Sequence, residues 1–154
     1  MLKKQRPTEV SLARKAADLL AVRPHFKKEL KQKLLKRGYE EKEVEDLIID
    51  FEERGYLNDR DHALFYIEEL KRKRFGKNEA LRRLSAKGFP KAEAESLIKV
   101  FFLENDEIAN IRYHLGKKKF NLQDVKDVKR AFDFLTRKGF SWERIREVLK
   151  IESW

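Results

Sequence analysis

The chain has 154 residues, 42% charged and 41% hydrophobic, and its 37 lysines and arginines outnumber 27 acidic residues to give a net charge of +10. Hydrophobic residues at regular spacing in so charged a chain indicate a folded protein and exclude a disordered one. No run approaches the roughly 18 apolar residues of a membrane span, no secretory leader opens the chain, and cysteine is absent. We therefore expect a cytoplasmic protein without disulfides or membrane segments.

Three similar helix endings indicate an internal repeat. They span Leu34–Tyr39, Leu84–Phe89 and Leu135–Phe140, and their glycines stand 50 and then 51 residues apart. A fixed period of this size is typical of a tandem array of one supersecondary unit. The prediction is an all-α fold of three three-helix repeats, similar to helix-turn-helix units, over 9–56, 57–104 and 105–154, after a basic N-terminal tail at 1–8.

The first repeat is predicted to contain three helices. Its first helix presents the i, i+3, i+4, i+7 stripe of an amphipathic helix, made by Ala13, Ala16, Ala17 and Leu20. Pro24 separates this helix from the second, because the residue before a proline is biased away from helical angles. The second helix ends at Gly38, where a left-handed cap favours glycine. A third helix follows and ends near Gly55.

The second and third repeats follow the same plan. Asn58 or Asp59 is expected to cap the first helix of the second repeat, and Pro90 suits the first turn of its last helix. Ser141 is expected to cap the last helix of the chain. At equivalent positions, Leu34, Leu84 and Leu135 are predicted to be buried. The aromatic residues after the repeated glycines, which are Tyr39, Phe89 and Phe140, are interpreted as apolar closure of helix ends.

Basic residues gather at the same place in each repeat. Residues 23–42 hold eight Lys or Arg against three acids, 71–91 hold nine against one, and 117–138 hold eight against three. A basic band repeated in this way favours a polyanion or an acidic protein surface as the partner. The candidate contact residues are Arg23, Lys27, Lys31, Lys71, Arg72, Lys73, Arg74, Lys77, Arg82, Arg83, Lys117, Lys118, Lys119, Lys126 and Arg130.

The sequence contains no pattern that indicates catalysis. His25, His62 and His114 occur in unrelated contexts without metal-ligand spacing, and we expect them at the surface or at helix ends. Glycines occur singly and form no phosphate-binding loop. Acidic pairs are common, but no nucleophile or base accompanies them. We therefore expect a protein that is not an enzyme and that holds neither a cofactor nor a metal.

Several stretches, in order along the chain, resemble the RecX family. The resemblance begins in Leu19–Leu34 and continues through Gly55–Asp59 and Phe75-Gly76 to Phe134–Ser141 and Ile145–Leu149. It covers nearly the whole chain. One departure is Phe26, where the family commonly has a small polar residue, and this predicts a different start of the second helix. Another departure is the longer, lysine-rich connection at 117–121.

The resemblance implies a regulator of the RecA recombinase in DNA repair, recombination and the SOS response. Members of the family are compact arrays of three-helix units that bind in the groove of the RecA–DNA filament. They typically repress ATP hydrolysis, strand exchange and co-protease activity. The implied partners are therefore the RecA filament and single-stranded DNA, with double-stranded DNA as a further candidate, and a monomer is expected.

Two other functions remain open. Three-helix units with a tight turn between their last two helices are similar to helix-turn-helix modules, which suggests direct DNA binding. Against this, the third helix of the first repeat is acidic, and its carboxylates would face phosphate in a groove. The other alternative is a passive helical scaffold that binds an acidic protein by charge alone.

Overall fold

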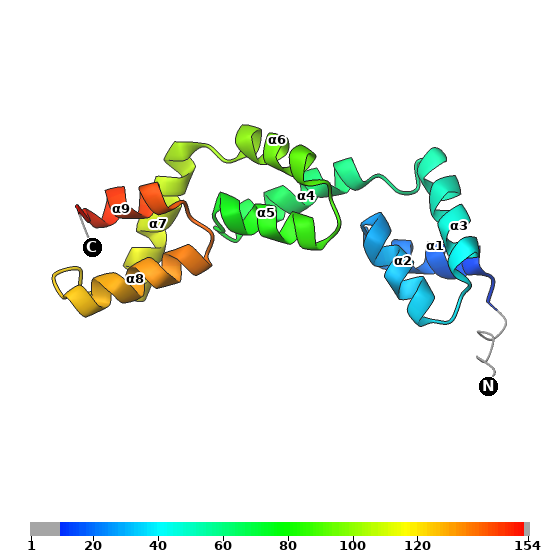
Figure 1. Ribbon diagram of the computed structural model, residues 1–154, viewed down its shortest axis with the longest axis horizontal. Helices are drawn as coiled ribbons and strands as arrows, with labels where there is room; N and C mark the ends of the chain where they lie inside the picture. Colours follow the sequence, from blue (N-terminus) through cyan, green and yellow to red (C-terminus); the bar gives the residue numbers. More distant parts are fainter. Residues whose placement is uncertain (1–9, 153–154) are drawn as a thin grey trace. The chain divides into compact units, whose positions relative to one another are not determined.

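The computed structural model describes residues 10–152, and within that span every regular element is a helix, nine in all (Figure 1). The all-α prediction is therefore confirmed for this part of the chain. The basic tail predicted at 1–8 lies outside the described residues. None of the helices described is long and apolar enough to cross a membrane.

The chain forms two compact units, each considered by itself. Among the described residues, the first unit comprises 10–63 and 87–89, and the second comprises 64–86 and 90–152. The helices follow one another in groups of three along the sequence. The boundaries of the repeats stay a prediction, because compact units are defined by packing and repeats by sequence similarity.

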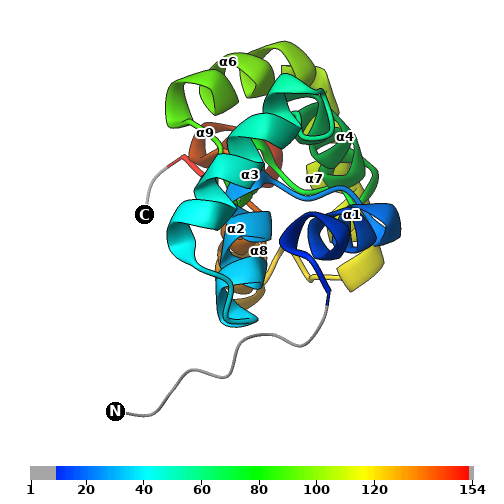
Figure 2. The same cartoon turned by 90° about the vertical axis from the view of Figure 1, so that its right-hand side faces the viewer.

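The first unit contains α1 (Leu12–Val22), α2 (Lys27–Lys36) and α3 (Glu41–Glu53), together with the first turn of α4 (Asp59–Arg72). Figure 2 looks onto α1, α2 and α3. Their shared core is apolar, and its buried members are Ala16, Leu30, Leu34, Val44, Phe51 and Leu57.

The stripe predicted for α1 is partly wrong. Ala16 is fully buried and Leu20 partly buried, but Ala13 and Ala17 are exposed. Leu12 and Leu19 pack against the core in their place. Leucine removes more apolar area from water than alanine does, so the helix is turned to bury its leucines.

The second unit contains the rest of α4 and five further helices. These are α5 (Lys77–Ala86), α6 (Lys91–Phe101), α7 (Glu104–Lys118), α8 (Val125–Arg137) and α9 (Trp142–Leu149). Helix α5 packs against α6, and α9 packs against both α7 and α8. The buried core of the last three helices consists of Ile111, Ala131, Leu135, Phe140, Ile145 and Leu149.

The predicted helix endings are confirmed. Gly38, Gly88 and Gly139 have φ angles of 88°, 84° and 89°, the left-handed conformation that glycine adopts readily. The leucines at the three equivalent positions are fully buried, and Phe89 and Phe140 are nearly so. Tyr39 is partly buried, and its hydroxyl donates to the carbonyl of Val10 at 3.0 Å.

The predicted helix starts are confirmed in part. Asn58 precedes α4 and accepts a hydrogen bond from the amide of Asp61 at 3.1 Å, as expected of an N-cap. Pro90 is the residue before α6 and not within its first turn. Ser141 stands at the N-cap of α9, but its side chain makes no capping bond. Instead, its backbone amide donates to the carboxylate of Glu107 at 2.5 Å, which anchors the start of α9 to α7.

Candidate functional site

The fifteen predicted contact residues divide between the two units. Arg23, Lys27 and Lys31 belong to the first unit, and the other twelve belong to the second. The groups that surround these cations differ in charge. Some of these cations lie against carboxylates of the chain itself, and others contact aromatic rings.

The three cations of the first unit are paired with carboxylates. Lys27 Nζ lies 2.6 Å from Glu52, and Lys31 Nζ lies 2.5 Å from Glu45 on α3. The hydrogen bond that Lys31 donates to Glu45 raises the pKa of Lys31. Arg23 forms an ion pair with Glu29. An anionic ligand would have to compete with these carboxylates, so this stretch is a weaker polyanion surface than its composition indicates.

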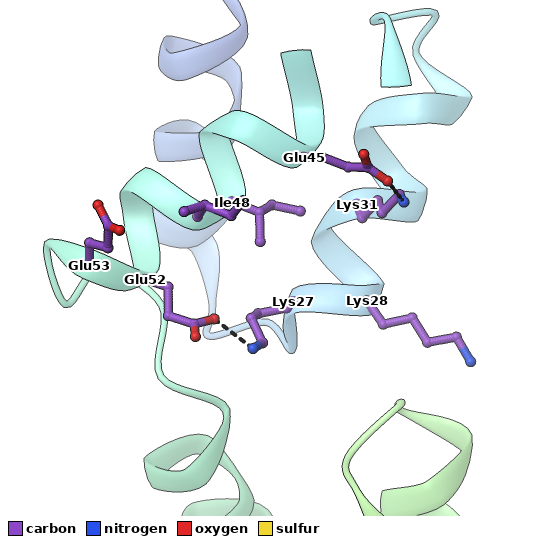
Figure 3. A pocket seen from close by; sticks show the side chains of 8 residues that line it. Lys27, Lys28, Lys31, Glu45, Ile48, Glu52 and Glu53 are labelled. Atoms are coloured by element: carbon purple, nitrogen blue, oxygen red, sulfur yellow. Dashed lines mark hydrogen bonds and ion pairs between the residues drawn. The ribbon is translucent and has the colours of Figure 1, made fainter. Parts of the chain in front are cut away.

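A groove of about 720 Å³ lies between α2 and α3, within the first unit (Figure 3). Ile48 and Ile49 contribute apolar surface, and Ile49 is 57% exposed. Lysines line the groove on α2, and glutamates line it on α3. The Lys27–Glu52 pair joins the two sides in Figure 3. The groove is therefore apolar in its lining and nearly neutral in charge.

Two arginines of the second unit serve a structural role. Glu79 on α5 is only 8% exposed, and it accepts hydrogen bonds from Arg82 at 2.7 Å and from Arg83 at 2.6 Å. The hydrogen bond from Arg82 is the main reason that the pKa of Glu79 is lowered to about 2, although burial opposes it. A buried carboxylate needs hydrogen-bond partners to offset its lost hydration. Arg82 and Arg83 therefore stabilise Glu79 and are less available to a ligand.

The lysines and arginines at the end of α4 have mixed surroundings. Lys71 and Lys73 pair with Glu68 and Glu69 at 3.7 and 2.6 Å along the same helix. Such exposed pairs contribute at most about 1 kcal/mol and are broken easily. Arg74 donates to Asn110 Oδ1 at 2.7 Å, and its guanidinium carbon lies 4.1 Å from the centre of the Tyr113 ring.

Two phenylalanines continue this pattern of cations on aromatic rings. Phe75 lies between Arg83 and Lys138, at 4.3 and 4.8 Å from its ring centre. Phe134 has Lys118 at 5.2 Å and Lys138 at 5.8 Å. All of these residues belong to the second unit. Cation–π contacts attract the ammonium groups of Lys118 and Lys138 to these rings without neutralising their charge.

Sequence reasoning did not select Tyr113, Phe75, Phe134 or Lys138 as site residues. A signal was present for Tyr113, because it lies off the apolar face of α7 and just before the run Lys117–Lys119. The remaining candidates on α7, α8 and the connection between them lie at the surface. Lys119, Lys126 and Arg130 are exposed, and Arg130 pairs with Asp127 at 2.8 Å. Lys77 lies 3.9 Å from the buried Glu107.

Two of the histidines are buried and do not lie at the surface, although His25 stands at a helix end, just before the N-cap of α2. His25 is 3% exposed and His114 is 9% exposed. His25 Nε2 lies 2.7 Å from Lys33 Nζ, which fits a neutral ring whose Nε2 accepts a hydrogen bond from the ammonium group. Burial lowers the pKa of both histidines. His114 Nε2 lies 2.9 Å from the carbonyl oxygen of Arg74 and thereby links α7 to the end of α4.

The comparisons with known proteins fit this fold. Residues 14–49 match the model of the RecX first three-helix domain. The chain is 33% identical over 140 residues to the regulatory protein RecX of Pelodictyon phaeoclathratiforme (strain DSM 5477 / BU-1), covering 88% of this chain and 85% of that one. It is 30% identical over 151 residues to the regulatory protein RecX of Vibrio vulnificus (strain CMCP6), with 96% of each chain covered.

A solved structure is also similar. The crystal structure of RecX from Lactobacillus salivarius matches with a TM-score of 0.73 at 18% identity, over 90% of this chain and 92% of the other. This likeness shows the shared fold, and the identities to the curated relatives show the family. The chain belongs to the RecX family.

Proposed function

We propose that this protein is a regulator of the RecA recombinase that binds the RecA–single-stranded DNA filament. The observation that carries the proposal is the 33% identity, over 88% of the chain, to a protein named regulatory protein RecX. In this proposal the protein acts in DNA repair and recombination, as a cytoplasmic monomer without catalytic activity of its own. Its effect on RecA ATPase, strand exchange and co-protease activity is inhibition.

The surface chemistry supports a charged filament as the partner. Among the described residues of the second unit, exposed cations such as Arg74 and Lys118 have aromatic neighbours and form no ion pair. A filament of protein on single-stranded DNA offers phosphates and acidic side chains to such groups. We propose that the cations of the second unit supply most of the contact and those of the first unit less.

Insertion of α3 into a DNA groove is less well supported. Glu45 and Glu52 are exposed on α3, and they already bind the lysines of α2. Entry into a groove would bring the acidic residues of α3 close to phosphates, and this repulsion argues against α3 as a recognition helix.

The test is a titration of RecA ATPase on single-stranded DNA, with RecA from the same organism. We expect the rate of ATP hydrolysis to fall as the protein is added. We also expect the protein to bind the RecA–DNA filament much more tightly than RecA alone. A rate that does not change, with no preference for the filament, would contradict the proposal.

A further inference from the structure

Several cations of the second unit lie on aromatic rings. Among the described residues, Arg74, Lys117, Lys118 and Lys138 form no ion pair, whereas they contact the rings of Tyr113 and Phe134. The ring of His114 lies 5.6 Å from that of Tyr113 and 5.7 Å from that of Phe134, so the two aromatic groups are contiguous. Like charges held together repel one another, and an anionic ligand would relieve that repulsion.

Arg74 is held in this group at a cost to its backbone. Its φ is 56°, in the left-handed region where glycine is favoured over other residues. Its carbonyl oxygen lies 2.9 Å from His114 Nε2, and its guanidinium donates to Asn110. This conformation ends α4, because the amides of Arg74 and Phe75 donate to the carbonyls of Lys71 and Leu70 at 2.9 and 3.1 Å. The hydrogen bond to Asn110 holds the guanidinium over the ring of Tyr113.

The basic surface of the first unit differs from this group of cations on aromatic rings. There, Lys31 lies within 3.2 Å of both Glu41 and Glu45, so its charge is compensated. No aromatic ring contributes to the groove between α2 and α3. The unpaired cations and the exposed ring of Tyr113 therefore lie together in the second unit.

The chemistry of the group favours single-stranded DNA over an acidic protein surface. Tyr113 is 41% exposed although the guanidinium of Arg74 lies over its ring. An unpaired base stacks readily on a tyrosine ring or on a guanidinium plane, while lysines contact the flanking phosphates. Duplex DNA would contact only the lysines, through its phosphates, because its bases are already stacked on one another. Carboxylates of a protein would likewise contact the cations, but they would not stack on the Tyr113 ring.

We propose that Arg74, Tyr113, Lys117 and Lys118 form a binding site for single-stranded DNA, in which a base stacks on the Arg74–Tyr113 pair. Lys138, beside Phe134, extends the cationic surface for the next phosphate. The site works without RecA, so it can be tested alone. Its role in regulation rests on the proposed function.

The experiment is a fluorescence-anisotropy titration of the full chain with a labelled oligothymidylate and with an abasic oligomer of the same length. Tyr113→Ala is expected to weaken binding of oligothymidylate by roughly 5-fold to 100-fold, the range for loss of one stacked base. Tyr113→Phe keeps the ring and should bind within about 2-fold of the unchanged protein. On the abasic oligomer, Tyr113→Ala should have little effect.

The variant Arg74→Gly tests whether loss of this side chain weakens DNA binding without lowering stability. Glycine suits a φ of 56°, so the variant is expected to melt at or above the temperature of the unchanged protein. It should nevertheless bind oligothymidylate several-fold more weakly. Lys99→Ala is the matched control, because it also removes one exposed charge from the second unit. Equal losses for Arg74→Gly and Lys99→Ala would overturn the site.

The remaining outcomes separate the site from the proposed function. Unchanged affinity in Tyr113→Ala, or equal losses on the two oligomers, would overturn stacking. Failure to bind oligothymidylate at low salt, together with intact inhibition of RecA ATPase, would overturn the site and leave the proposed function standing. Binding that depends on Tyr113 without any effect on RecA would support the site and contradict the proposed function.

Discussion

The carboxylate of Asp59 accepts a hydrogen bond of 2.8 Å from the backbone amide of Lys27, 32 residues earlier in the chain. Lys27 is the first residue of α2, and the N-cap residue, Phe26, has no side-chain oxygen that could accept a capping hydrogen bond. Phe26 is instead fully buried, with its ring 4.3 Å from that of His62 and 6.2 Å from that of Phe89. The start of α4 therefore supplies the acceptor for the first amide of α2.

Loss of this cap should destabilise the protein. Asp59→Ala is expected to lower the free energy of unfolding by about 0.5–2 kcal/mol, the usual range for a lost N-cap. Asp59→Asn keeps an oxygen acceptor and should cost less. Urea unfolding followed by circular dichroism measures both. Equal stability of Asp59→Ala and the unchanged protein would mean that the amide of Lys27 needs no such acceptor.

Replacing Gly76, in the turn before α5, and replacing Gly116, inside α7, should have opposite effects on stability. Gly76 donates its amide to the carbonyl of Lys138 at 2.8 Å, and a Cβ added to it would lie 2.3 Å from the backbone of Gly139. Gly116, inside α7, has open space around it. Gly76→Ala should therefore lower the melting temperature clearly. Gly116→Ala should raise stability by up to about 1 kcal/mol, because alanine favours the helix.

Burial at the centre of the chain predicts a large effect for one leucine. Leu84 on α5 is fully buried, whereas Leu122 is 45% exposed. Leu84→Ala is expected to cost about 2–5 kcal/mol through lost burial and the cavity left behind. Leu122→Ala should change stability by no more than about 0.5 kcal/mol. Thermal melts of both variants test this, and similar melting temperatures would contradict the packing of α5.

Acid should destabilise the second unit through Glu79. Its pKa is lowered to about 2 in the folded protein by the hydrogen bond from Arg82, followed by those from Arg83. A carboxyl with a lowered pKa stabilises the fold fully above its unfolded value of about 4.5, and that contribution is lost as pH falls toward 2. The full shift corresponds to about 3 kcal/mol, which solvent screening at the exposed Arg82 reduces to about 1–2 kcal/mol.

The variant Glu79→Gln isolates this contribution, because other carboxyls of the chain also titrate in acid. The stability difference between the unchanged protein and Glu79→Gln should shrink between about pH 5 and pH 2. Urea midpoints at several pH values measure it. A difference that stays constant over this interval would show that Glu79 does not titrate with folding.

Reversing charge at the end of α4 should abolish regulation. Changing Lys71, Arg72, Lys73 and Arg74 to Glu removes the densest cationic cluster of the second unit, and inhibition of RecA ATPase should be lost. Lys71 and Lys73 lie beside Glu68 and Glu69, so new repulsion is expected to lower stability by about 1 kcal/mol. Circular dichroism should confirm the fold. Inhibition at unchanged concentrations would remove this cluster from the contact surface.

The sequence by itself determined that the fold is helical and where several of the helices end. Gly38, Gly88 and Gly139 end helices because a left-handed backbone favours glycine wherever the chain goes next. Leu34, Leu84 and Leu135 are buried because helical spacing fixes them on one apolar face. These properties depend on neighbours within a few residues, and for that reason they could be read from the chain. The resemblance to the RecX family rested on the same short-range features.

Only the tertiary structure decided which cations are free to bind a partner. Lys31 and Lys118 lie in equally basic stretches, but Lys31 meets the carboxylates of α3 while Lys118 lies over Phe134. His114 is buried because the chain folds α7 against the end of α4, which brings it to Arg74, 40 residues away. Charge compensation and burial depend on contacts between distant segments, and composition counts charges without showing what faces them.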